Sequence, residues 1–309
     1  MWRAISIQIL IMLTVLLARP AQSAANADRA SQLDSLFASL PHTTFEWVSA
    51  EGVSDRVAMR VPVDLDGIRG WFQVDTGLDA TVVYGGIPAE RKWETYDGMY
   101  RVPSLEIGRI RLGPAWLRSR ADTGAEGDMI GSLGLDLLVG HFVLIDYPGR
   151  RLAIMRAGDV PLWLLLQTSW TPAALRDGKF FLTVALGGRS VDGLFFDTGA
   201  SAFHVTVDFD TWTALTGCTG PDSATTRWTV SSWGNKVTAV GCPARGPLVI
   251  GSARIPDPPV FYLKEQPKLF AGWPFPAAGL VGNAPFWDRV VILDLGIRPR
   301  FGIVQLEAQ

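Results

Sequence analysis

The chain has 309 residues, of which 48% are apolar and 19% are charged, and its formal net charge is −2. This composition excludes a disordered chain, and the length suits two domains of about 150 residues each. The nearly balanced charge and the lack of Lys/Arg runs argue against nucleic acid or an anionic membrane as the main partner. The 32 glycines and 20 prolines indicate many turns and short strands rather than long helices.

The N-terminus has the layout of a secretory signal peptide. Arg3 precedes an almost wholly apolar segment from Ile5 to Ala18, and small residues follow it. This apolar segment is shorter than the roughly 20 residues that span a bilayer. We therefore predict a signal peptide over residues 1–25, a periplasmic or secreted protein, and no stable membrane association after cleavage. An uncleaved anchor is the alternative.

The segment that follows the predicted signal peptide, residues 26–44, leaves three alternatives open. It is a removable prosegment, a short helix over residues 29–40, or a strand that completes a sheet between two halves of the protein.

The chain has two cysteines, Cys218 and Cys242, both in its second half. In an oxidising compartment, two cysteines this close in sequence are expected to form a disulfide, and a pair of buried thiols is the alternative. None of the three histidines has neighbours that suit metal binding, so we predict no metal and no other cofactor.

Two segments of the chain resemble each other. The first covers residues 58–79 and the second covers residues 181–201. Each reads as a strand, a tight glycine turn and a second strand that ends in Asp-Thr-Gly. The two copies of this tripeptide are Asp75-Thr76-Gly77 and Asp197-Thr198-Gly199.

A second matching block lies downstream of each copy. Gly134 precedes Asp146 by 12 residues, and Gly282 precedes Asp294 by the same 12 residues, with apolar residues around each glycine. One half of the chain is thus a duplicate of the other. The predicted organisation is an N-terminal lobe over residues 45–155, a linker over residues 156–176 and a C-terminal lobe over residues 177–309.

A third Asp-Thr-Gly, which begins at Asp122, lies in a polar stretch with no apolar strand before it. The tripeptide alone is a weak signal, because it arises often by chance in chains of this length. We interpret this third copy as a polar loop. The other two copies gain specificity from their matched strands and glycines.

With its two Asp-Thr-Gly loops, the sequence resembles the pepsin and retropepsin family of aspartic peptidases. The resemblance implies an all-β fold of two homologous β-barrel lobes, related by a pseudo-twofold axis, with a cleft between them. It further implies an aspartic endopeptidase in which Asp75 and Asp197 activate a water against a peptide or protein substrate. A monomer is expected.

The resemblance also assigns supporting roles to six neighbouring residues. The two threonines would hydrogen-bond across the lobe interface, and the glycines after them would permit a tight turn. The two later glycines would pack beneath the Asp-Thr-Gly loops. These residues are Thr76, Thr198, Gly77, Gly199, Gly134 and Gly282.

Substrate-binding residues are also expected near the pair. Asp79 occupies a place where retropepsins carry an aspartate that contacts the substrate backbone and an arginine; capping of the turn is the alternative. Residues 93–102 are expected to form a hairpin that covers the cleft, with Tyr96 and Tyr100 as candidate tip residues.

The second lobe offers a hairpin over residues 228–240, which turns at Gly234-Asn235. Trp233 beside this turn either lines the cleft or packs on the lobe core.

Two other functions are compatible with the same residues. The first is a peptide-binding module of the same fold that does not cleave its ligand. The second is a glycoside hydrolase that uses Asp75 and Asp197 as its carboxylate pair, which the 12 tryptophans would suit. The natural substrate is not indicated by the sequence.

Overall fold

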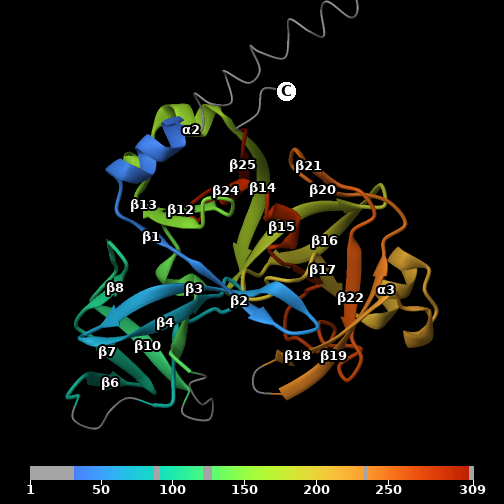
Figure 1. Ribbon diagram of the computed structural model, residues 1–309, viewed down its shortest axis with the longest axis horizontal. Coiled ribbons are helices and arrows are strands. Elements are labelled where there is room, and N and C mark those ends of the chain that lie inside the picture. Colours follow the sequence, from blue (N-terminus) through green and yellow to red (C-terminus); the bar gives the residue numbers. More distant parts are fainter. Residues whose placement is uncertain (1–30, 87–90, 121–126, 233–234, 306–309) are drawn as a thin grey trace, which may run out of the picture.

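A computed structural model describes residues 31–86, 91–120, 127–232 and 235–305. The predicted signal peptide and the third Asp-Thr-Gly lie outside these residues. The described chain is mostly β-strand and forms two mixed sheets (Figure 1).

The first sheet has ten strands and is built from the first half of the chain. Along β3, apolar residues alternate with more exposed ones, so that Met59, Val61, Val63 and Leu65 are buried on one face. The strands are β2 (Glu46–Ala50), β3 (Ser54–Leu65), β4 (Ile68–Val74), β5 (Val82–Tyr84), β6 (Glu94–Tyr96), β7 (Met99–Val102), β8 (Leu105–Ile107), β9 (Ile110–Arg111), β10 (Ala115–Arg120) and β11 (Met129–Leu133).

The second sheet has fifteen strands and draws on both halves. Its strands are β1 (His42–Thr44), β12 (Phe142–Asp146), β13 (Arg151–Met155), β14 (Thr168–Arg176), β15 (Lys179–Leu186), β16 (Arg189–Phe196), β17 (Val205–Val207), β18 (Thr226–Ser232), β19 (Asn235–Pro243), β20 (Leu248–Ile250), β21 (Ala253–Ile255), β22 (Pro259–Leu263), β23 (Gly279–Val281), β24 (Val290–Asp294) and β25 (Arg300–Val304).

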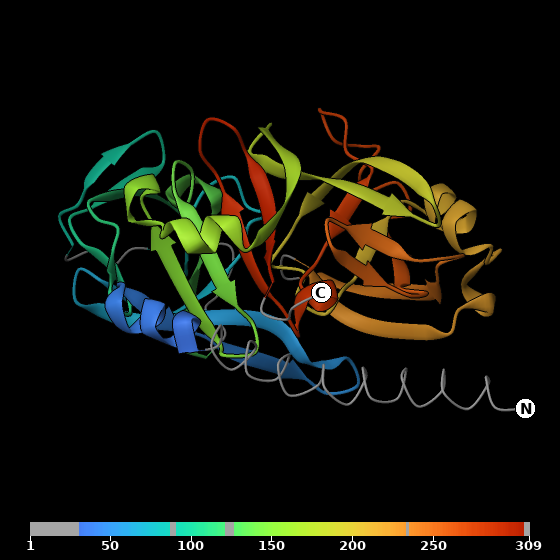
Figure 2. The ribbon, with the colours of Figure 1, turned by 90° about the horizontal axis from the view of Figure 1, so that it is seen from above.

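The two halves of the chain meet at β12 and β24, which are the strands after the two matched glycines. They pair antiparallel, with Leu144 opposite Ile292 at the centre of the register. Both strands are buried along their whole length. Figures 1 and 2 show these strands between the two halves of the molecule. The equal spacing in sequence thus corresponds to two strands that lie side by side.

The segment before the first repeat combines two of the three alternatives left open by the sequence. Residues 31–39 are helical, and Leu33, Leu36 and Phe37 bury one face of this helix. The next residues form β1, which pairs with β13 at the edge of the fifteen-stranded sheet.

Besides the helical residues 31–39, the helices among the described residues are short. They are α2 (Leu162–Leu166), α3 (Phe209–Thr216) and the 3-10 turns η1 (Leu135–Leu137), η2 (Ala157–Asp159), η3 (Pro221–Ser223) and η4 (Ala284–Phe286). None of the described helices is both long and apolar enough to cross a membrane.

The predicted all-β class is confirmed at the level of two mixed sheets. The expectation of closed β-barrel lobes is not met, because the strand order of neither sheet returns to its starting strand among the described residues. For the fifteen-stranded sheet, the physical reason lies in β14, which pairs with β25 on one side and β15 on the other. It therefore joins the strands between the halves to those of the second half in one open sheet.

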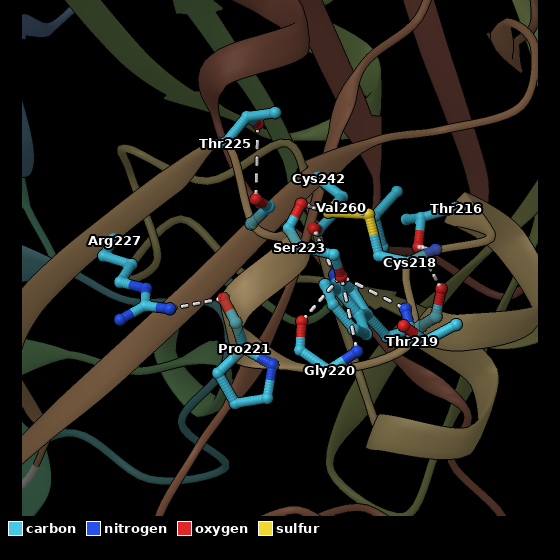
Figure 3. Close-up of a disulfide and its surroundings, with 12 residues drawn as sticks. Thr216, Cys218, Thr219, Gly220, Pro221, Ser223, Thr225, Arg227, Cys242 and Val260 are labelled. Carbon is cyan, nitrogen blue, oxygen red and sulfur yellow. Dashed lines mark hydrogen bonds between the residues drawn. A yellow bond between two sulfur atoms is a disulfide. The ribbon is translucent and has the colours of Figure 1, made fainter.

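The predicted disulfide is confirmed. Cys218 follows α3, Cys242 lies in β19, and their sulfurs are 2.05 Å apart (Figure 3). The bridge closes a segment that contains η3. Within this segment, the Ser223 hydroxyl accepts hydrogen bonds from the backbone N–H groups of Thr219 and Gly220.

Candidate functional site

The two repeated Asp-Thr-Gly sequences form loops at the ends of equivalent strands. β4 ends at Val74, and the N–H of Asp75 donates to the carbonyl of Leu133 at 3.0 Å. β16 ends at Phe196, and the N–H of Asp197 donates to the carbonyl of Val281 at 2.9 Å. Each aspartate is thus fixed by the strand that precedes the matched downstream glycine.

The two loops are joined by four reciprocal hydrogen bonds. The N–H of Thr76 donates to Thr198 Oγ1 at 2.9 Å, and the N–H of Thr198 donates to Thr76 Oγ1 at 3.0 Å. The hydroxyl of Thr76 donates to the carbonyl of Phe196, and that of Thr198 to the carbonyl of Val74, both at 2.8 Å. Both threonines are buried, so the bonds form away from water.

The glycines of the two loops allow each loop to approach the opposite aspartate. A Cβ atom at Gly77 would lie 2.6 Å from Cγ of Asp197, and one at Gly199 would lie 2.6 Å from Cγ of Asp75. A side chain at either position would collide with a carboxyl group. The glycine N–H groups also donate to their own aspartates, to Asp75 Oδ1 at 3.0 Å and to Asp197 Oδ1 at 2.8 Å.

This arrangement brings the carboxyl groups of Asp75 and Asp197 into a hydrogen-bonded pair. Burial raises the pKa of Asp75 well above its ordinary value, and the charge of Asp197 raises it further. Burial also raises the pKa of Asp197. Two carboxyl groups this close share one proton, because ionising both would place two negative charges side by side. Such a pair offers one O–H donor and several acceptor sites, which suits acid–base chemistry or the binding of a carbonyl or hydroxyl group.

The two matched glycines downstream pack tightly against the loops. A Cβ at Gly134 would lie 2.5 Å from the backbone carbon of Ala80. A Cβ at Gly282 would collide with the backbone oxygen of Ala200. Both contacts are with backbone, so neither position has room for a side chain.

Polar side chains support the two loops differently. In the first half, Asp136 accepts hydrogen bonds from the N–H and the hydroxyl of Thr81 at 2.9 and 2.7 Å. In the second half, the Asn283 amide donates to the carbonyl of Thr198 at 3.0 Å, and its oxygen accepts a bond from the Tyr147 hydroxyl at 2.7 Å. Tyr147 belongs to the first half, so this support also links the halves.

Asp79 lies exposed at the boundary between the two halves. It neither pairs with an arginine nor caps its turn by a hydrogen bond among the described residues, so neither of its two expected structural contacts is present. Instead, the turn between β14 and β15 packs against it, because a Cβ at Gly178 would lie 2.6 Å from Cβ of Asp79.

The expected first hairpin is present. β6 and β7 pair antiparallel around Asp97 and Gly98, both of which have positive φ. Tyr96 is exposed, whereas Tyr100 packs on the main core. Four strands separate β6 from β4 in the sheet order, so strand pairing alone does not bring either tyrosine to Asp75. Their contact with a ligand stays a prediction.

The expected second hairpin is also present, as the antiparallel pair of β18 and β19. Trp233 lies outside the described residues, and its two expected roles stay predictions.

Two residues near the pair were not predicted from the sequence. Gln73, in β4, donates from its amide to the carbonyl of Gly199 at 3.1 Å. Lys179, the first residue of β15, is buried and lowers the pKa of both Asp75 and Asp197 in opposition to the effect of burial. The register pairs Phe181 with Phe195, and its continuation by two residues would place Lys179 opposite Asp197, just past the end of β16. The register shifts by one residue between Leu182 and Val184, so counting back from the turn of the hairpin would have placed Lys179 opposite Phe196 instead.

The comparisons with known proteins give matches to solved structures only. No family model and no curated protein matches the chain. Among the solved structures, basic 7S globulin from soybean matches with 10% identity and a TM-score of 0.45, over 85% of this chain and 96% of that chain. Conglutin gamma, a basic 7S globulin from lupine seeds, matches with 10% identity and a TM-score of 0.46, over 85% of this chain and 94% of that chain.

By this comparison, the assignment to the pepsin and retropepsin family of peptidases and the prediction of an aspartic-type endopeptidase are wrong. The matched proteins are described as globulins, and no peptidase family is matched. The physical reason for the error is that the two Asp-Thr-Gly loops specify a geometry. Reciprocal threonine bonds and close glycine contacts hold two carboxyl groups together in any protein that keeps them, whether or not a bond is cleaved. The glycoside hydrolase alternative is not tested by these matches.

Proposed function

We propose that this chain is an exported, two-lobed protein that binds an extended peptide at the Asp75–Asp197 pair and does not hydrolyse it. The observation that carries the proposal is the reciprocal joining of the two loops, which places both carboxyl groups at the junction between the halves. A site at such a junction is reached from both halves, as suits a ligand that extends across them.

The protonation of the pair supports recognition of a neutral polar group. With one shared proton, the pair donates one hydrogen bond and accepts others, which matches a backbone carbonyl or a hydroxyl group. The residues that directly follow the two loops, Leu78 and Ala200, are both apolar, and neither is exposed. Apolar surroundings strengthen such hydrogen bonds.

The matched contacts of the loops support a pseudo-twofold relation between two pepsin-like lobes. Every hydrogen bond that Thr76 makes to the second half has a counterpart from Thr198 to the first half. The contacts of Gly77 and Gly199 with the opposite aspartates correspond in the same way.

The disulfide supports export. Disulfides persist in oxidising compartments and are rare where thiols are kept reduced. The Cys218–Cys242 bridge is therefore consistent with a periplasmic or secreted protein.

The test uses a hexapeptide with a central statine residue, whose secondary hydroxyl fits between two carboxyl groups that share a proton. Calorimetric titration should show binding to the wild-type protein. Asp75→Asn and Asp197→Asn should each weaken binding about tenfold or more, because each removes a hydrogen bond to a charged group. The control is Asp122→Asn, which alters the third copy of the same tripeptide and should bind normally.

A second measurement tests for cleavage. A pool of unmodified peptides, incubated with the protein at several acidic and neutral pH values, should be recovered intact by mass spectrometry. Cleavage that disappears in both Asp75→Asn and Asp197→Asn would overturn the non-hydrolytic proposal. Failure of the statine peptide and of the pool to bind would overturn peptide binding itself.

A further inference from the structure

Lys179 is a buried cation next to the Asp75–Asp197 pair. Its residue is 9% exposed, and its ammonium nitrogen lies 5.8 Å from the centre of the Trp273 ring. A lysine is rarely buried to this extent unless its charge is paired. Lys179 is therefore unusual both in its burial and in its place beside the two carboxyl groups.

The ammonium group has no close acidic partner. Among the described residues, Lys179 forms no ion pair within 4.0 Å, whereas other partly buried cations do. Arg151, for example, pairs with Asp146 at 2.7 Å, and Arg300 pairs with Asp294 at 2.7 Å. The Lys179 nitrogen is not among the fully buried side-chain atoms that lack a partner, so it still contacts solvent, and its three donors are open to an acceptor supplied by a ligand.

An open surface pocket of about 320 Å³, called the cavity below, has Trp273 in its wall. It is lined by the loop over residues 270–277, which also supplies Phe275 and two prolines. The turn that carries Lys179 lies at this loop, since Arg176 donates to the carbonyl of Pro276 at 3.4 Å. Trp273 thus belongs to the wall of the cavity and also contacts Lys179, and Lys179 in turn lies beside the Asp pair.

The charges around Lys179 determine whether an anionic group of a ligand can bind beside it without electrostatic repulsion. Arg176 pairs with Asp177 at 3.4 Å and stacks over Phe181, and Asp79 lies exposed across the turn. When Asp75 and Asp197 share a proton, they carry one negative charge, which the charge of Lys179 offsets. A second anion is then not repelled by a net negative site, whereas loss of the shared proton would add repulsion.

We propose that Lys179 binds a carboxylate of the peptide that the Asp pair holds, and that the cavity lined by Trp273 receives the residue carrying this carboxylate. This inference rests on the proposed peptide binding and names the ligand class, a peptide with a carboxylate close to the backbone group at the pair. The carboxylate belongs either to an Asp or Glu side chain or to the C-terminus of the peptide.

The test uses matched statine peptides, so that the statine hydroxyl fixes the register on the Asp pair. One set carries Glu or Gln directly before or directly after statine, and a second set ends directly after statine as a free acid or as an amide. Affinities are measured by calorimetry at about pH 6, where a glutamate side chain is ionised. At one position at least, the acid should bind about tenfold more tightly than its neutral partner.

Variants test whether Lys179 causes the preference for acidic over neutral peptides. Lys179→Gln should abolish the preference for the acidic peptide and leave the affinity for the neutral peptide nearly unchanged, and Lys179→Arg should restore much of it. Lys264→Gln removes an exposed lysine from the same half and should leave the preference intact. Thermal unfolding of each variant checks that the fold is retained.

The outcomes separate this inference from the proposed function. If neutral statine peptides bind but no acidic peptide is preferred, or if Lys179→Gln keeps the preference, the role of Lys179 is wrong and peptide binding stands. If no statine peptide binds, the proposed function fails. A preference confined to the free-acid set would assign the site to the C-terminus of the peptide, and one confined to the Glu set to a side chain.

Discussion

Thr76 and Thr198 each receive a hydrogen bond from the other's backbone N–H, at 3.0 and 2.9 Å respectively, across the boundary between the two halves. Each hydroxyl accepts this bond and at the same time donates to a backbone carbonyl of the opposite half. Each threonine therefore satisfies two buried backbone groups with one side-chain oxygen. Its removal leaves both of those groups without a partner.

The first prediction concerns this double role. Thr198→Ala removes the acceptor of the Thr76 N–H and the donor to the Val74 carbonyl. Each buried group left unsatisfied costs about 1–3 kcal/mol, so we expect a loss of about 3 kcal/mol in the free energy of unfolding. Urea denaturation measures the loss. Thr198→Ser keeps the hydroxyl and should recover most of it; equal losses in both variants would show that the methyl group matters instead.

The second prediction concerns the stability cost of the Asp pair. Burial raises the pKa of Asp75, so the folded state binds a proton more tightly than the unfolded chain does. Between the unfolded pKa near 3.8 and the higher folded pKa, the folded state carries more protons, and the free energy of unfolding falls as pH rises. Asp75→Asn removes this ionisation. We expect the variant to exceed the wild type in stability at about pH 7.

Chemical denaturation at a series of pH values measures this effect. The wild type loses stability as pH rises above the unfolded pKa and the variant does not, so the advantage of the variant should be largest near neutral pH and shrink towards pH 4. Asp159→Asn, at an exposed position in η2, is the control and should change stability little at any pH. An Asp75→Asn variant that is less stable than the wild type across the whole range would contradict the prediction.

The sequence predicted the parts of the site that depend on local repeats. Asp75 and Asp197 could be paired because each follows an apolar strand and precedes the same two residues. Gly134 and Gly282 could be placed under the loops by their equal spacing to Asp146 and Asp294. Such features depend on a few adjacent residues in a fixed conformation, and a duplicated pattern makes them visible.

The remaining features depend on contacts between distant segments. The pairing of β1 with β13 and the position of β14 between two sets of strands follow from the packing of the whole chain. Lys179 was not predicted because its place beside the pair follows from strand register and not from a motif. Activity was mispredicted because the loops determine carboxyl geometry and do not determine turnover.

The third prediction concerns His204, whose imidazole has a buried Nδ1 atom with no hydrogen-bond partner among the described residues. Burial lowers the pKa of His204 from 6.5 to about 4. The unfolded chain then binds the proton more readily than the folded state, so stability is lost as pH falls from 6.5 towards 4. The difference corresponds to about 3 kcal/mol. This slope has the opposite sign to that of the Asp pair.

The variant His204→Gln cannot be protonated and should lose this part of the acid sensitivity. The free energy of unfolding, measured by denaturant titration between about pH 7 and pH 4, should decline less steeply in the variant than in the wild type. Parallel pH profiles for the two proteins would show that the imidazole is protonated as easily in the folded state as in the unfolded chain.

The last prediction concerns the disulfide between Cys218 and Cys242, which are 24 residues apart in sequence. Closing a loop of this length restricts the unfolded chain and stabilises the fold by about 3.5 kcal/mol in the chain-entropy account. We expect Cys218→Ala/Cys242→Ala to lose about this amount in guanidinium denaturation. Cys242 is fully buried, so the alanine at this position adds a smaller loss from reduced packing.

The wild-type protein treated with a reductant separates these two contributions. Reduction opens the loop and leaves both sulfur atoms in the fold, so its loss in stability isolates the effect of the cross-link from that of packing. The reduced protein should therefore lie between the oxidised wild type and the double variant. A reduced protein as stable as the oxidised one would show that the bridge adds nothing to the stability of the second half, whose strands β19 and β22 would then hold this segment by pairing alone.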